Sequence, residues 1–119
     1  MITIKKFDEA RENRVMDLQA EGINPTMYWA YERSREVNNI LNFNDVIWDR
    51  DIPEIVKSCR ELGIKEFTIS CEFSGLISTL AEFEKHGVHM AGLTKVKLEH
   101  RDFETGEHAV ASAIKMIVD

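Results

Sequence analysis

The chain has few of the residues that mark several classes of protein. Its 119 residues include only two cysteines and two prolines, so neither a disulfide-rich secreted scaffold nor a proline-rich linker is indicated. No apolar run approaches the roughly 20 residues of a membrane span. The segment Met1–Phe7 also lacks the long apolar core of a signal peptide. We therefore expect a cytoplasmic protein with reduced thiols and no membrane partner.

Basic residues are also in the minority. Fifteen lysines and arginines stand against 21 acidic residues, which gives a formal net charge of −6. A phosphate backbone repels such a chain unless its basic residues gather on one face, and the short basic clusters here alternate with acids. Direct nucleic-acid binding is therefore disfavoured, and a basic protein partner suits the acidic surface better.

The sequence contains enough apolar residues to form a hydrophobic core. Apolar residues make up 44% of the chain and recur along its whole length, which predicts one domain over residues 1–119. Their spacing predicts a helix over 3–21 and a second helix over 24–39. Asn24 is the expected N-cap of the second helix, with Pro25 at its first position.

Strand and helix patterns alternate after the second helix. Strands are predicted where apolar and β-branched residues gather: 43–48, 65–70, 88–100 and 109–118. Two helices separate the first three strands. Asp51 and Glu54 have the spacing of a capping box before the first of these helices, which Gly63 ends. Ser70 or Ser74 is expected to cap the next.

The predicted order of elements is α-α-β-α-β-α-β-β. Two strand–helix–strand units predict parallel neighbours with right-handed crossovers, and residues 102–107 predict a closing hairpin with an antiparallel edge. The even positions of 88–100 are expected on one face. The final segment, 109–118, is apolar on both faces, so a helix is the alternative there. The fold class is α/β, with α+β as the alternative: a four-stranded mixed sheet with helices packed on it.

One candidate site lies after the strand over 43–48. Asp49 and Asp51 are paired acids at the carboxyl end of a strand, where carboxylate oxygens can hold Mg²⁺. The alternative is that Asp51 caps a helix and Asp49 forms a turn. We prefer the second interpretation, so no metal and no cofactor is predicted.

The loop over 70–75 is a further candidate. It joins the carboxyl end of a strand to a helix, whose free backbone N–H groups attract anions. No glycine-rich phosphate motif is present, and the spacing brings none of the four histidines near Cys71. No set of catalytic residues is therefore predicted, and the sequence favours a protein that is not an enzyme. The candidate ligand crevice consists of six residues: Asp49, Asp51, Ser70, Cys71, Ser74 and Gly75.

An aromatic cluster in the second helix suggests an interface. Its side chains cover more of the helix circumference than one packed face can bury, and tyrosine and tryptophan are favoured at protein interfaces. The alternative is that the first helix covers them. The candidate interface comprises Tyr28, Trp29, Tyr31, Arg33 and Ile40.

Three segments carry a family resemblance: Phe43–Val56, Gly63–Ser70 and Thr79–Gly87. Across residues 25–110 the chain resembles small uncharacterised proteins of conjugative elements, plasmids and phages of Clostridia-like Firmicutes. The resemblance implies an accessory protein of a mobile element in a bacterial cytoplasm. It supplies no activity and no catalytic residue.

These observations favour a non-enzymatic protein that binds a protein partner or itself. One specific version is an inhibitor of a host nucleic-acid-binding defence protein, whose basic groove an acidic surface would occupy. The alternative is a small ligand-binding, metal-binding or hydrolytic protein that uses the crevice at residues 70–75.

Overall fold

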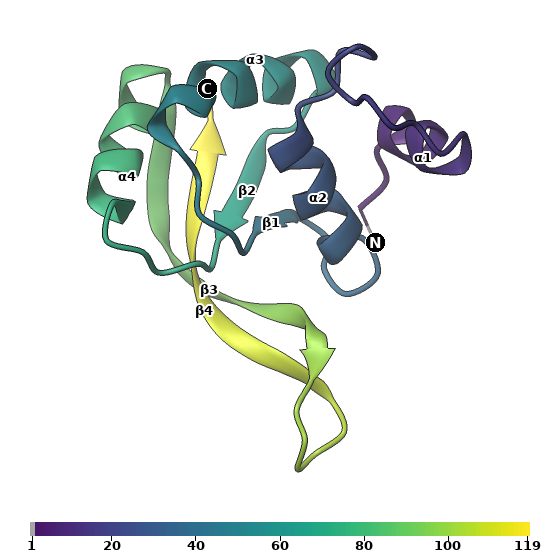
Figure 1. Ribbon diagram of the computed structural model, residues 1–119. Coiled ribbons are helices and arrows are strands. Elements are labelled where there is room, and N and C mark those ends of the chain that lie inside the picture. The colour runs from purple at the N-terminus through teal and green to yellow at the C-terminus, as the bar shows by residue number, and fades with distance from the viewer. Residues whose placement is uncertain (1) are drawn as a thin grey trace.

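The computed structural model describes residues 2–119. Within that range four α-helices, one 3₁₀ turn and four strands follow one another in the predicted order, as an α+β fold (Figure 1). Their bounds are α1 Lys5–Glu12, α2 Pro25–Ser34, β1 Leu41–Phe43, η1 Asp49–Asp51, α3 Ile52–Leu62, β2 Glu66–Ile69, α4 Leu76–Lys85, β3 Val88–Arg101 and β4 His108–Val118. No helix in the described residues is both long and apolar enough to cross a membrane.

The four strands form the predicted mixed sheet, in the order β1-β2-β4-β3. β1 and β2 are parallel, and β4 is antiparallel to both of its neighbours. The prediction that both strand–helix–strand units join adjacent strands is therefore wrong for the second unit, because β4 lies between β2 and β3. The final strand is central rather than an edge. The segment is apolar on both faces and so lacks polar–apolar alternation, which explains why it also suggested a helix.

The first helix is shorter than predicted. It ends at Glu12 rather than near residue 21, and Arg14 takes a left-handed conformation with φ of +52°. A left-handed residue cannot continue a right-handed helix. Turns then carry the chain to α2.

The second helix begins as predicted. The Asn24 side chain accepts a hydrogen bond from the Met27 backbone N–H at 3.0 Å, as an N-cap does. The helix ends at Ser34 rather than near residue 39. The Ser34 hydroxyl lies 2.7 Å from the Ala30 carbonyl oxygen, a local bond that competes with helix continuation.

Two expected caps and one strand are corrected by the structure. β1 covers 41–43 rather than 43–48. Asp51 is the N-cap residue of α3, as predicted, but as the last residue of the η1 turn it already has helical φ and ψ, and its side chain makes no capping bond. The predicted position is therefore right, and the side-chain bond of the capping box is absent. The N-cap of α4 is Gly75 rather than Ser70 or Ser74, again without a side-chain bond.

The last two strands form the predicted hairpin, which extends away from the helices (Figure 1). A bulge between Met90 and Leu93 shifts the register of β3. Side chains on opposite sides of a bulge lose their common parity. The even positions of β3 therefore do not share one face as predicted: Val88 packs in the core, whereas Val96 pairs with Ala111 on the other face.

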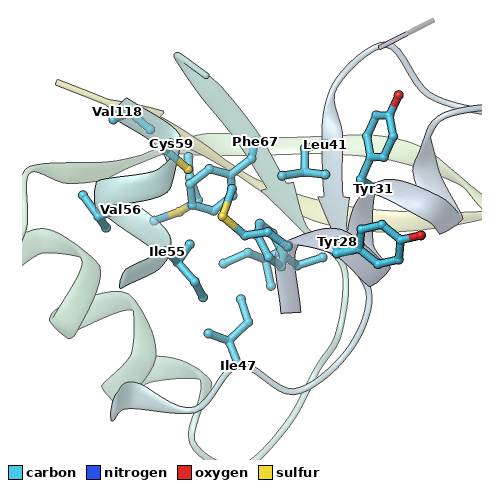
Figure 2. Packing of buried hydrophobic residues seen from close by; sticks show 14 of the residues in the cluster. Tyr28, Tyr31, Leu41, Ile47, Ile55, Val56, Cys59, Phe67 and Val118 are labelled. Atoms are coloured by element: carbon cyan, nitrogen blue, oxygen red, sulfur yellow. The ribbon is translucent and has the colours of Figure 1, made fainter. Parts of the chain in front are cut away.

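The main core lies between the sheet and α3 and α4, with α2 against β1 (Figure 2). The rings of Phe43, Phe67 and Phe83 follow one another from β1 to β2 to α4, with centroids 5.2 and 5.4 Å apart. These side chains and Ile55 of α3 are essentially inaccessible to solvent. This packing fixes β1, β2, the start of β3 and the end of β4, and the hairpin extends from the last two.

Candidate functional site

The outer edge of β1 is closed by a side chain of α2. The Ser34 hydroxyl accepts a hydrogen bond from the Asn42 backbone N–H at 3.0 Å and lies 3.1 Å from the Asn42 carbonyl oxygen. Ser34 therefore contacts both backbone groups that a further strand beside β1 would use.

The outer edge of β3 is closed in the same way at one residue. The Asn38 side-chain amide donates to the Lys97 carbonyl oxygen at 2.8 Å and accepts from the Lys97 N–H at 3.0 Å. A carboxamide carries the same donor and acceptor as a peptide group. Asn38 thus takes the place of a strand at this point.

These two contacts show how strongly the sheet curls. β1 and β3 stand at opposite ends of the strand order, yet residues 34–38 reach both edges. The hairpin, which extends away from the helices in Figure 1, therefore bends toward the side of the sheet on which α2 lies. The gap between the two edges remains unfilled by a strand.

A groove of about 500 Å³ occupies that gap. We call it the edge groove, and its lining residues come from α2, the following loop, β1 and β3: Arg33, Ser34, Asn38, Asn42, Asn44, Asp45, Lys97, Leu98, Glu99 and His100. Both signs of charge are present. Arg33 forms an ion pair with Asp45 on the β1 side, while Lys97 and Glu99 are exposed on the β3 side.

A chain of polar side chains supports the β1 side of the edge groove. The Thr68 hydroxyl donates to Asn42 Oδ1 at 2.7 Å, and Asn42 Nδ2 donates to Ser70 Oγ at 3.0 Å. Ser70 in turn donates to Asn44 Oδ1 at 2.7 Å. Asn42 and Thr68 are buried, so these bonds fix the amide orientations at the bottom of the groove.

The predicted interface residues do not form one surface. Tyr28 and Tyr31 are buried, and Phe7 of α1 packs against their rings with centroids 6.0 and 5.6 Å away. Only Trp29 remains open, with 53% of its surface exposed. The first helix thus covers most of the aromatic cluster, as the alternative interpretation held.

The other two predicted interface residues lie elsewhere. Arg33 lines the edge groove. Ile40 is partly buried and borders a second groove of about 520 Å³, between the loop after α2 and Val96 of β3.

The predicted ligand crevice is assembled in part. A groove of about 430 Å³, which we call the loop crevice, is lined by Asp49, Ser74 and Gly75 together with Trp48 and Phe73. The other three predicted members, Asp51, Ser70 and Cys71, are not among its lining residues.

Asp49 has a structural role in the loop crevice. It accepts hydrogen bonds from the hydroxyls of Ser78 at 2.6 Å and Thr79 at 2.7 Å. These two bonds, the Ser78 bond first, lower the pKa of the Asp49 carboxyl. Asp49 therefore ties the η1 turn to α4. Among residues 2–119 no group of three histidine, cysteine or acidic side chains is placed to hold a metal ion.

The thiols and histidines are not arranged for nucleophilic chemistry. Burial raises the pKa of Cys59 to about 12, and burial together with the Glu72 charge raises the pKa of Cys71. A protonated thiol is a poor nucleophile. His89 contacts Glu84 and Asp119, and His108 contacts backbone carbonyl groups of β3.

Sequence reasoning missed the edge groove. Its amide residues fall in the segment Asn38–Asn44, where four of seven residues are asparagine. Asparagine is disfavoured in helices and strands. The asparagine-rich segment between α2 and β1 was therefore the one sequence feature that could have indicated the groove. The partner residues on β3 follow from the curl of the sheet, which no local pattern shows.

A family model matches residues 26–118, from the first turn of α2 to the end of β4, and the family is described as a domain of unknown function. The match leaves α1 and the loop after it outside. No curated protein matches the chain, and no solved structure does.

Proposed function

This chain belongs to that family, DUF7698, and we propose that it acts by protein–protein interaction, binding an extended segment of a protein partner in the edge groove. The observation that carries the proposal is the groove of about 500 Å³ between the edges of β1 and β3. Ser34 and Asn38 already occupy the backbone groups of Asn42 and Lys97 at those edges. A bound segment would therefore be held by the lining side chains rather than by strand addition at these two residues.

The lining of the edge groove fits a peptide better than an apolar ligand. The side-chain NH₂ group of Asn44, whose carbonyl oxygen accepts from Ser70, can bond an extended backbone. Asp45 and Glu99 can receive basic side chains, and Arg33 and Lys97 acidic ones. A partner segment of mixed charge, with an extended backbone, is the chemistry that these residues would recognise.

The proposal that the protein is not an enzyme rests on the protonation of its two thiols and on the hydrogen bonds of Asp49. The raised pKa values of Cys59 and Cys71 disfavour a thiolate at neutral pH. The Asp49 carboxyl is engaged by two hydroxyls. These contacts give each group a structural role.

The biological setting is part of the proposal. The resemblance carried by Phe43–Val56 and the two later segments supports an accessory protein of a bacterial mobile element. A partner within a host defence system would fit, and the net charge of −6 favours a basic one. The genes flanking this one test the setting: conjugation or phage genes are expected, and a conserved metabolic operon would contradict it.

A second candidate function is ligand binding in the loop crevice. It is favoured by the position of that crevice at the carboxyl end of the parallel pair β1 and β2, where ligands bind in many sheets. Exposed Trp48 beside Phe73 would supply stacking contacts. Nucleotides and divalent cations are the probes for this alternative, with a thermal shift as the readout.

The test of the leading proposal is a random-peptide display selection on the full chain, followed by calorimetry. Selected peptides should bind the wild type and lose about tenfold or more in affinity for Asn44→Ala or Arg33→Ala. Lys57→Ala, an exposed change on α3, is the matched control and should bind unchanged. Peptides that bind all three variants equally would contradict the edge groove as the site.

A further inference from the structure

Three apolar side chains on α4 and in the first half of β3 are exposed. Ile77 is 83% exposed, Met90 56% and Leu93 78%. The tight turn after α4 makes α4 and β3 antiparallel neighbours, and Glu84 of α4 contacts His89 of β3 at 2.7 Å. Ile77 lies about two helical turns before Glu84, on the same flank, and so lies over the same edge farther along. We call these three residues the apolar edge strip.

The backbone beside the apolar edge strip is unpaired. The Lys97 N–H and C=O point away from β4, since Asn38 binds both. The register runs without interruption from Leu93 to Lys97, and alternate residues of a strand point the same way. The backbone groups of Leu93 and Lys95 therefore also point outward, and no other described residue pairs with them. Such an edge is a template for another strand.

We propose that two copies of this chain pair through this edge, β3 against β3 in antiparallel orientation, around a two-fold axis at Thr94. A register centred on Lys95 would oppose two lysines and would need Lys97, which Asn38 occupies. The bulge disrupts pairing on the other side of Leu93. The register centred on Thr94 pairs the unbonded backbone groups of both Leu93 and Lys95, so that Leu93 of each copy lies opposite Lys95 of the other.

The charges near β3 are compatible with this antiparallel pairing. The carboxylates of Glu84 on α4 and Asp119 after β4 gather around His89 near the start of β3, and Lys95, Lys97 and Glu99 are exposed in its second half. A two-fold axis at Thr94 sets the two lysines of each copy opposite Leu93 and Ala91 of the other, and Glu99 opposite His89. No two like charges are therefore directly paired across this isologous contact.

Self-association goes beyond the proposed peptide binding and uses a different surface. The Asn38–Lys97 pair separates the two: Leu93 and Lys95 lie on one side of it, and the edge groove begins at Lys97. A dimer would leave the groove of each copy free.

Sedimentation equilibrium of the full chain tests the proposal. The wild type should approach twice the chain mass of 13.7 kDa as its concentration rises to millimolar. Ile77→Asp and Leu93→Asp should remain at one chain mass. Met16→Asp, at a residue that is 97% exposed outside the strip, is the matched control and should dimerise normally. A wild type that stays monomeric, or variants that dimerise like it, would overturn the proposal.

A cysteine placed at the axis tests the register. Paired residues at a non-hydrogen-bonded position lie about 4.5 Å apart between Cα atoms, within reach of a disulfide. In a Cys71→Ser background, Thr94→Cys should therefore form a covalent dimer under mild oxidation, while Lys95→Cys, which would face Leu93, should stay mostly monomeric. Equal yields at both positions would refute the register. Loss of dimer with unchanged peptide affinity would leave the proposed function standing.

Discussion

The side-chain amide of Asn38 forms with Lys97 the two hydrogen bonds that a neighbouring strand would otherwise form. This pair connects the loop after α2 to a strand 59 residues later in the chain. It closes the curled sheet and marks the limit between two stretches of the β3 edge. The stretch before it is free, and the stretch after it lines the edge groove.

Replacing Asn38 by alanine should loosen this closure. Asn38→Ala removes both bonds to Lys97 and is expected to lower the free energy of unfolding by about 1 kcal/mol, since the pair is partly exposed to water. Urea denaturation measures the change. Asn39→Ala, at the exposed neighbour, is the control and should have little effect. Equal stability of the two variants would show that the Asn38 amide does not close the edge.

The Tyr31 hydroxyl is expected to hold α1 on α2. It accepts from the Ile4 N–H at 3.1 Å and donates to Asp8 at 2.8 Å. Tyr31→Phe should therefore destabilise the protein by about 1 kcal/mol and speed amide exchange in α1. Tyr28→Phe is the matched control, because no hydrogen bond of that hydroxyl occurs among residues 2–119. If both variants exchange alike in α1, the hydroxyl has no anchoring role.

His89 should make stability depend on pH. Its hydrogen bonds to Glu84 and then to Asp119 raise the pKa of the imidazole. A raised pKa in the folded state means that the stabilisation is complete below the unfolded pKa and is lost as pH rises through the folded value. The stability advantage of wild type over His89→Gln should therefore shrink as the pH rises above the ordinary histidine pKa of about 6.5. His86→Gln is the control, and an advantage that grows with pH would contradict the assigned contacts.

The two thiols should be unreactive in the folded protein. Burial raises the pKa of Cys59 to about 12 and also raises that of Cys71. We expect Cys71 to alkylate more slowly than free cysteine at neutral pH, and Cys59 only after unfolding. Mass spectrometry after timed iodoacetamide treatment measures both. If Cys71 is alkylated faster than free cysteine, the prediction is wrong and Cys71 is a candidate nucleophile.

Much of the fold could be predicted because local signals agreed with the final structure. Asn24 and Pro25 mark the start of α2, and Gly63 takes the left-handed φ of +71° that ends α3. The predicted capping bonds depended on context. Asp51 occupies the N-cap position but makes no side-chain bond because it belongs to a 3₁₀ turn, and Ser70 forms hydrogen bonds with Asn42 and Asn44 instead.

The candidate site was harder to predict because contacts distant in sequence form it. The aromatic cluster of α2 was recognised, but Phe7 covers Tyr28 and Tyr31 through packing that periodicity does not reveal. The edge groove needs β4 to insert between β2 and β3 and the hairpin to curl. Both depend on long-range pairing, whereas the sequence pattern suggested parallel neighbours.

The central claim is that the edge groove receives an extended partner segment. Amide chemical-shift mapping of the full chain with a selected peptide tests it most directly. The account predicts that the largest shifts fall on residues 42–45 and 97–100, with slower hydrogen exchange of backbone amides along these edges. Shifts confined to the loop crevice at residues 46–49 and 73–79, or to Trp29 and its neighbours, would contradict it.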